Sequence, residues 1–241
     1  MPVCGVLNPK TVMLDAPRRP STKVKAMFAA IVARYDLANH LLSGGLDFLW
    51  RKRAAITVQK WAPVRILDLA TGTGDLALKL KQACPRSTVI GADFCLPMLA
   101  RAQEKGARNL VGADALHLPF ADGSFDVVTV AFGLRNMKSW RGAVAEMGRM
   151  LRPGGHLLIL EFSLPHPPLN RIYRTYLHTI LPRLAAVITG VRDAYEYLGD
   201  SIEEFPHDQA MCAILREAGF DETRSKPLSG AIVTLYSARR T

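Results

Sequence analysis

Short apolar runs alternate with helical patterns of hydrophobic residues through the middle of the chain. Between the runs, apolar positions such as Leu76, Leu80, Val144 and Met147 recur at the spacing of an amphipathic helix. Apolar strands that alternate with helices are typical of a parallel sheet covered by helices on both faces. The predicted strands are Arg65–Leu69, Thr88–Asp93, Asn109–Ala113, Phe125–Ala131 and His156–Phe162.

The end of the chain predicts a hairpin. Two strand-like segments, Phe220–Lys226 and Ala231–Ser237, follow a helix expected from about Asp208 to Ala218. The turn Pro227–Gly230 that separates them is short enough for an antiparallel pair at one edge of the sheet. Together these patterns predict an α/β fold.

Three segments outside the alternating pattern have their own character. Residues 1–20 contain four prolines and little periodicity, so we expect a flexible arm. Residues 21–62 have apolar positions at helical spacing and predict a helical cap, broken at Ser43–Gly45. Residues 166–200 are amphipathic and predict a lid, or a helix pair facing a membrane. We therefore treat 21–241 as one domain.

Composition narrows the class of protein. No apolar run reaches the roughly 18 residues that a membrane span needs, and the N-terminus lacks a signal-peptide pattern, so we expect a cytoplasmic protein. The four cysteines show no paired spacing, which argues against a disulfide framework or a zinc site. A net charge of +10 favours anionic partners. Nucleic acid is not expected, because no basic stripe with interleaved aromatic residues is visible.

The segment from Val64 to Asp75 carries the first chemical motif. A predicted strand runs into a turn with Gly72 and Gly74, and a predicted helix follows. Glycines let the backbone approach a ligand closely, and a helix N-terminus offers free N–H groups. Asp93, 19 positions after Gly74, ends the next strand and is placed to accept hydrogen bonds from both hydroxyls of a ribose. The motif predicts a nucleoside-type cofactor.

The choice of cofactor rests on later segments, because the Gly72–Ala77 turn alone also fits a loose pattern for NAD. The terminal hairpin is similar to the end of the seven-stranded sheet of S-adenosylmethionine-dependent methyltransferases. Residues 112–120 resemble the segment that brackets adenine in those enzymes, which implies that Asp114 binds the exocyclic amine and the Ala115 amide meets the ring. No second nucleotide-binding half is visible after residue 165, which disfavours a dinucleotide.

The resemblance extends to one family over roughly residues 24–241. The chain resembles the ubiquinone/menaquinone biosynthesis C-methyltransferases in YDLANHLLSGGLDFLW (35–50), FGLRN (132–136) and RMLRPGGHLLILEFS (149–163). The resemblance implies a seven-stranded, Rossmann-like class I methyltransferase sheet with the cap and lid described above. It also implies S-adenosylmethionine as cofactor. The residues implied to contact it are Gly72, Thr73, Gly74, Asp93, Asp114, Ala115 and Ala131.

The implied reaction transfers a methyl group to a ring carbon of a prenylated quinol. The substrate would be demethylmenaquinol, 2-polyprenyl-6-methoxy-1,4-benzoquinol, or both. Three positions depart from the family pattern: Ala38 stands where Met is usual, Asp47 where His is usual, and Ala131 where the family often has Ser. Ala70 replaces the first glycine of the general methyltransferase pattern, a substitution that this family tolerates. An Ala131 contact would use only the backbone.

The resemblance implies Arg135, Asn136 and Tyr35 as catalytic residues. Arg135 stays protonated, so it would stabilise a phenolate rather than act as the base. Asn136 would orient the ring hydroxyl or a water. The base stays open among a water, Tyr35, Asp36 and His40, and Glu161 is equally a pocket or a scaffold residue. No metal is needed, because a sulfonium is itself the electrophile.

Residues 168–190 predict contact with an anionic membrane. If Arg171, Arg174 and Arg183 face lipid phosphates, this segment would admit a prenylated substrate from the inner face of the membrane. The alternatives for the segment are a homodimer contact and an ordinary lid. The alternative functions are a methyltransferase for another small molecule or RNA, and a nucleotide-binding protein without activity.

Overall fold

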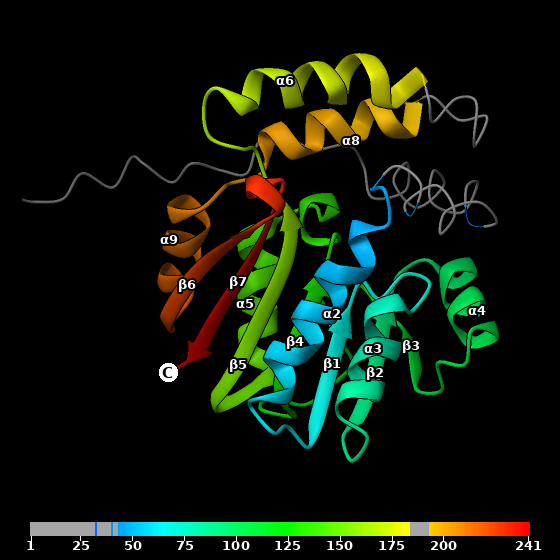
Figure 1. Ribbon diagram of the computed structural model, residues 1–241. Coiled ribbons are helices and arrows are strands. Elements are labelled where there is room, and N and C mark those ends of the chain that lie inside the picture. Colours follow the sequence, from blue (N-terminus) through cyan, green and yellow to red (C-terminus); the bar gives the residue numbers. More distant parts are fainter. Residues whose placement is uncertain (1–31, 33–39, 41–42, 184–192) are drawn as a thin grey trace, which may run out of the picture.

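Seven strands form one mixed sheet in the computed structural model, which describes residues 32, 40, 43–183 and 193–241 (Figure 1). The strand order is β3-β2-β1-β4-β5-β7-β6. All pairs among the first five strands are parallel, whereas β7 runs antiparallel to both β5 and β6. The strands are β1 (Arg65–Leu69), β2 (Thr88–Asp93), β3 (Leu110–Gly112), β4 (Phe125–Ala131), β5 (Leu151–Phe162), β6 (Phe220–Leu228) and β7 (Val233–Arg240).

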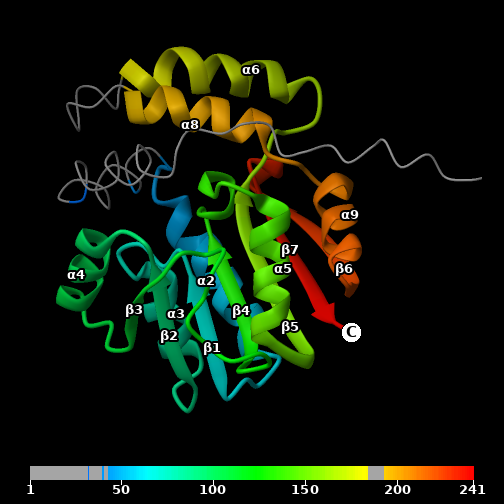
Figure 2. The ribbon, with the colours of Figure 1, turned by 180° about the vertical axis from the view of Figure 1, so that it is seen from behind.

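Two hydrophobic cores lie on opposite faces of the sheet. On one face, α2 (Leu46–Gln59) and α3 (Asp75–Ala83) bury their apolar sides. On the other face, α5 (Trp140–Met150) and α9 (Gln209–Glu217) do the same. The helix α4 (Leu96–Glu104) lies beside β2 and β3 (Figures 1 and 2). The prediction of an α/β fold with helices on both faces is therefore confirmed.

The chain reverses its direction across the sheet between β1 and β4. After β1 it proceeds outward through β2 and β3, then returns to place β4 on the other side of β1. The helices that follow β1 and β4 thus leave the sheet on opposite faces, and a crevice forms at the carboxyl ends of these two strands. Ligands of open α/β sheets bind in such a crevice.

A helical layer covers this end of the sheet. It consists of α6 (Leu169–Thr175), the π-helical turn η2 (Tyr176–Ile180), and α8 (Asp193–Glu204), which packs against η2. Both figures show α6 and α8 side by side across the carboxyl ends of the parallel strands. The described parts of the segment predicted as a lid, residues 166–183 and 193–200, therefore lie over the crevice.

Strands β1, β2 and β4 have the predicted bounds, whereas β3 is shorter and β5 is longer. The backbone hydrogen bonds between β2 and the β3 segment nevertheless continue at both ends, from the Gly91 amide to the Asn109 carbonyl (2.8 Å) and from the Ala113 amide to the Asp93 carbonyl (3.0 Å). The prediction placed the start of β5 at His156, because Gly154 and Gly155 are typical of the end of a helix. The strand instead begins at Leu151 and passes those residues through an irregularity in its pairing with β4. The terminal hairpin is confirmed.

Parts of the prediction lie outside the described residues. The arm at 1–20 is among them, and so is the cap before residue 43 except for Val32 and His40. Within the described part of the cap, Gly45 adopts a left-handed conformation (φ 78°) immediately before α2, as the predicted break requires. Among the described residues, no helix is long and apolar enough to cross a membrane, and no group of three or more His, Cys, Asp or Glu side chains could hold a metal ion.

Candidate active site

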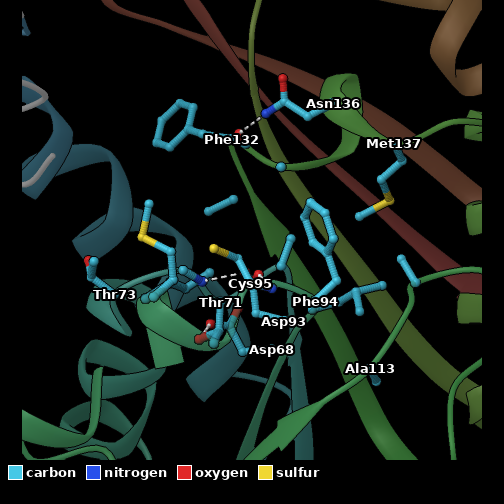
Figure 3. A pocket seen from close by; sticks show the side chains of 18 of the residues that line it. Asp68, Thr71, Thr73, Asp93, Phe94, Cys95, Ala113, Phe132, Asn136 and Met137 are labelled. Atoms are coloured by element: carbon cyan, nitrogen blue, oxygen red, sulfur yellow. Dashed lines mark hydrogen bonds between the residues drawn. The ribbon is translucent and has the colours of Figure 1, made fainter. Parts of the chain in front are cut away.

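The turn after β1 forms the floor of a cavity at the sheet crevice (Figure 3). Gly72 has a positive φ of 55°, and a Cβ built there would meet no atom within 4 Å, so the backbone is open toward a ligand. Gly74 has a φ of 82° and caps α3, and its absent Cβ would lie 3.0 Å from the Cβ of Ala102 on α4. Gly74 is not among the residues that line the cavity, so the structure places it behind the turn, as a packing residue.

Ala70 is the residue that replaces the first glycine of the general methyltransferase pattern. It has a φ of 50°, in the left-handed region that glycine favours and alanine does not. Its methyl group faces Gly133, which follows β4: a Cβ built on Gly133 would lie 2.6 Å from the Ala70 Cβ. The two turns that bound the crevice are thus in direct contact.

This contact predicts a coupled pair of substitutions. Gly133→Ala should lower the free energy of unfolding by about 1–3 kcal/mol through overpacking, because the φ of Gly133 (−114°) itself suits alanine. Ala70→Gly removes the opposing methyl group, so the double variant should recover most of that loss. Urea unfolding of the wild type, both single variants and the double variant measures the coupling. Simple additivity would mean that the clash is not the cause.

Asp93 ends β2 beside the turn and is almost fully buried. Its Oδ2 accepts a hydrogen bond from the Gly72 amide at 2.9 Å, and its Oδ1 accepts one from the Cys95 amide at 2.8 Å. Burial raises the pKa of this carboxyl, against the effect of the backbone donors. The carboxylate is therefore fixed in orientation at the cavity wall.

Asp68 lies under the turn and also lines the cavity. Its two carboxylate oxygens accept hydrogen bonds from the hydroxyls of Thr71 (2.6 Å) and Thr129 (2.7 Å). Burial nonetheless raises the pKa of the Asp68 carboxyl from 3.8 to about 6. A cationic ligand in the cavity would stabilise the ionised form of this buried carboxylate, because its positive charge offsets the lost solvation.

The raised pKa of Asp68 predicts a pH dependence. Because the folded state holds the proton more tightly, this group stabilises the fold most below pH 3.8 and loses that contribution as the pH rises through about 6. The loss amounts to about 3 kcal/mol at 1.36 kcal/mol per pKa unit. Urea unfolding from pH 4.5 to 7 should therefore show the wild type losing stability relative to Asp68→Asn. A flat difference would contradict the assigned pKa.

The segment after β3 bounds the opposite end of the cavity. Asp114 accepts a hydrogen bond from the Leu116 amide at 3.0 Å, and Ala113, Asp114, Ala115 and Leu116 all line the cavity. Met137 approaches the same end from beyond β4 (Figure 3). The cavity is thus apolar with one carboxylate at this end.

Phe132 separates this first cavity from a second one. It follows β4, lines both cavities and has a φ of 58°, a conformation that costs a bulky residue roughly 1–2 kcal/mol. The second cavity has a volume of about 480 Å³ and lies under α6, η2 and α8. Its apolar and aromatic lining residues include Trp50, Phe162, Leu169, Ile172, Tyr173, Tyr176, Leu177, Leu181, Leu198 and Ile202.

Arg135 lines the second cavity, on the short 3₁₀ helix η1 (Leu134–Asn136). Its Nη1 donates to Glu161 at 2.5 Å and to the Phe132 carbonyl at 2.8 Å, and its guanidinium lies 5.1 Å from the centre of the Phe162 ring. Glu161 is fully buried, lines neither cavity and also accepts from the Phe162 amide. Of the two roles considered for Glu161, the structure favours the scaffold residue, because Glu161 holds Arg135 and contributes no surface to either cavity.

Asn136 faces the other way. It lines the first cavity, where its amide donates weakly to the Phe132 carbonyl at 3.4 Å. Its Oδ1 is buried and has no hydrogen-bond partner among the described residues. η1 thus directs the side chains of Arg135 and Asn136 into different cavities, and the role expected for Asn136, to orient the ring hydroxyl or a water, stays a prediction.

The catalytic residues expected in the cap are only partly described. Tyr35 and Asp36 lie outside the described residues. His40 lines neither cavity, and its Nδ1 lies 2.8 Å from Asp47. Asp47 lines the second cavity, is buried, and also accepts from Ser43 (3.0 Å) and from Arg51 (2.5 Å). Asp47, which stands where the family usually has His, is therefore part of a hydrogen-bonded network with His40 at its outer end.

Ala131 and Thr73 complete the positions predicted for the cofactor. Both line the first cavity, together with Gly72, Asp93, Asp114 and Ala115. Thr73 is buried, and its hydroxyl lies 3.3 Å from the Lys105 ammonium. Of the seven positions, six face one cavity. Sequence reasoning did not assign a role to Arg51 or Phe132, which line both cavities, or to Asp68.

The sequence matches one protein family and several of its named members. The model of the ubiE/COQ5 methyltransferase family matches residues 18–240. A demethylmenaquinone methyltransferase of Thermus thermophilus is 51% identical over 202 residues, which are 80% of this chain and 91% of that protein. A ubiquinone/menaquinone biosynthesis C-methyltransferase of Dinoroseobacter shibae is 39% identical over 222 residues, which are 89% of each.

Solved structures share the fold. A methyltransferase of Thermotoga maritima, described as S-adenosylmethionine-dependent and as a possible histamine N-methyltransferase, aligns with a TM-score of 0.62. The alignment covers 90% of this chain and 99% of that one at 17% identity. A second S-adenosylmethionine-dependent methyltransferase, from Aquifex aeolicus, aligns with a TM-score of 0.53 over 74% and 82% of the chains at 18% identity. At these identities the likeness concerns the fold alone.

Proposed function

The chain belongs to the ubiE/COQ5 methyltransferase family, and on this basis we propose that it methylates a ring carbon of a prenylated quinol with S-adenosylmethionine. Demethylmenaquinol is the first substrate to test, because the relative from Thermus thermophilus is named for it. The observation that carries the proposal is the pair of cavities that meet at Phe132. One has carboxylates and an open glycine turn, and the other is largely apolar, with Arg135 beside its aromatic wall.

The first cavity fits the cofactor. Asp93 would hold the ribose hydroxyls, and the apolar end at Ala113–Leu116 and Met137 would hold the adenine, with Asp114 near its amine. Four carboxylates line the cavity: Asp68, Asp75, Asp93 and Asp114. This surplus of acid suits a ligand with an ammonium and a sulfonium group. When bound, S-adenosylmethionine supplies an electrophilic methyl group.

The second cavity supplies what a quinol ring carbon requires. A ring carbon is a weak nucleophile until a neighbouring hydroxyl loses its proton, which for an unperturbed phenol has a pKa of about 10. The Arg135 guanidinium would stabilise the resulting phenolate. Because Glu161 and the Phe132 carbonyl fix the guanidinium, it needs little reorganisation when the charge develops. Only the reduced quinol has the hydroxyl, so the oxidised quinone should not react.

The rim of the second cavity supports a prenylated substrate. Leu169 and Ile172 line this cavity, yet they are 54% and 69% exposed, so they stand at its opening. Ile180 on the same helical run is also exposed. An isoprenoid tail would cover these apolar side chains as it leaves the cavity.

A direct assay tests the proposed function. The purified protein is incubated with radiolabelled S-adenosylmethionine and, in separate reactions, demethylmenaquinol, the benzoquinol, the oxidised quinone and RNA. We expect label only in the two quinol reactions. Label in RNA would favour the alternative methyltransferase class, and cofactor binding without transfer to any acceptor would favour a non-catalytic protein.

The same surface supports our proposal of contact with an anionic membrane. Arg171 and Arg183 are exposed near the apolar rim, whereas Arg174 pairs with Glu203 on α8 at 3.2 Å and is less available than expected. We expect co-sedimentation with anionic vesicles at low salt and less at high salt. Equal recovery with neutral vesicles would remove the electrostatic part of the proposal.

A further inference from the structure

Arg51 stands where the two cavities meet. This residue of α2 is 8% exposed and lines both cavities. Its Nη1 donates to Asp47 at 2.5 Å, and its guanidinium lies 5.3 Å from the centre of the Phe132 ring. Its Nη2 lies 3.8 Å from Asp75, beyond hydrogen-bond range. Asp47 therefore fixes one edge of the guanidinium, and the other edge points toward the first cavity at the start of α3.

The charges around the first cavity single out Arg51. Besides its four carboxylates, the described residues that line this cavity include two cations, Arg51 and Lys138. Lys138 is exposed and directly precedes Ser139. The Ser139 hydroxyl and the Leu116 side chain both lie near Gly142, so Lys138 belongs to the Leu116 end of the cavity. Arg51 lies at the other end, beside Asp75. Lys105 also pairs with Asp75 and contacts the Thr73 hydroxyl at this end, but it does not line the cavity.

The proposed cofactor must span these two ends. Figure 3 shows Thr73 and Ala113 on opposite sides of the cavity, with Asp93 between them. If Asp93 holds the ribose and the Ala113–Leu116 segment holds the adenine, the amino-acid part of the cofactor extends toward Thr73 and Asp75. The cofactor's carboxylate then needs a cation at that end.

We infer that Arg51 binds the carboxylate of the amino-acid part of the cofactor, and that Asp47 positions Arg51 for it. A guanidinium offers paired N–H donors that match a carboxylate, and Asp47 occupies only part of them. The inference rests on the proposed function, because it assumes the orientation of the cofactor. It deepens that function by assigning the subsite for the amino acid.

The test compares two ligands that differ only in this group. Isothermal calorimetry measures S-adenosylmethionine and its decarboxylated analogue against the wild type, Arg51→Met and the control Lys138→Met. A hydrogen bond to a charged group contributes about 1.5–3 kcal/mol, so the wild type should prefer the carboxylated ligand by about 10- to 150-fold. In Arg51→Met we expect a preference of at most about 3-fold, with the analogue bound nearly as well as by the wild type. Lys138→Met should keep the full preference.

Several outcomes would overturn the inference. Weaker binding of both ligands by the same factor in Arg51→Met would assign Arg51 to packing. An unchanged preference in Arg51→Met, or its loss in Lys138→Met, would place the carboxylate elsewhere. Because Arg51→Met leaves Asp47 buried without this cation, the double variant Asp47→Asn/Arg51→Met provides a second measurement, with the same loss of preference expected. If the wild type binds neither ligand, the proposed function fails first, and calorimetry shows this without any quinol.

Discussion

Arg135→Met should lower kcat by about 100- to 1000-fold, the range observed when one donor to a developing oxyanion is removed. The same substitution leaves Glu161 buried without the cation that neutralises it. Breaking a buried ion pair in this way costs about 3–5 kcal/mol of stability. Low activity of the single variant could therefore come from unfolding alone.

A double variant separates the two effects. Glu161→Gln removes the uncompensated charge, so Arg135→Met/Glu161→Gln should regain most of the lost stability and none of the lost kcat. Urea unfolding and the methyl-transfer assay measure the two quantities. Arg149→Met is a matched control, because Arg149 also pairs with a carboxylate, Glu146 at 2.7 Å, but lines neither cavity. Recovery of activity together with stability in the double variant would remove Arg135 from the chemistry.

Asp93→Ala should raise the KM for S-adenosylmethionine by about 100- to 10,000-fold, because two hydrogen bonds from the ribose to a charged group are lost at about 1.5–3 kcal/mol each. At saturating cofactor, kcat should change little, since the contact exists before and during the reaction. Initial rates over a range of cofactor concentrations separate the two parameters.

Asp126→Ala is the control for Asp93→Ala. Like Asp93, Asp126 accepts two backbone hydrogen bonds, from the amides of Val64 and Arg65 at 2.7 Å each, but it lies at the opposite end of β1. Loss of two backbone partners should lower the stability of both variants. Only Asp93→Ala should raise the KM. A similar rise in both would show that the effect passes through the fold and not through the ribose.

The sheet could be predicted from the sequence because the central strands are short, predominantly apolar segments that alternate with helical patterns. β5 was predicted too short because Gly154 and Gly155 are locally typical of the end of a helix, and only the pairing with β4 extends the strand through them. The cofactor turn could be predicted for a similar reason. The spacing between its glycines and Asp93 indicates a nucleoside site even when the rest of the fold is unknown.

The junction of the cavities could not be predicted in this way. Asp47 and Arg51 are four residues apart on a helix, which in sequence looks like an ordinary exposed ion pair. Their burial comes from packing of α2 against the crevice. Arg135 and Asn136 are adjacent in sequence, and their separation into two cavities depends on the short η1 helix, whose side-chain directions no periodicity reveals.

The anchoring of Arg135 to β5 has a consequence for how such enzymes diverge. β5 lies between β4 and β7, so the glutamate that orients the arginine belongs to the middle of the sheet. Part of the wall that would contact a ring and its tail comes from α6, η2 and α8. Substitutions in those helices can therefore reshape acceptor preference while the reacting groups keep their alignment, which lets one catalytic framework accommodate new aromatic acceptors over evolutionary time.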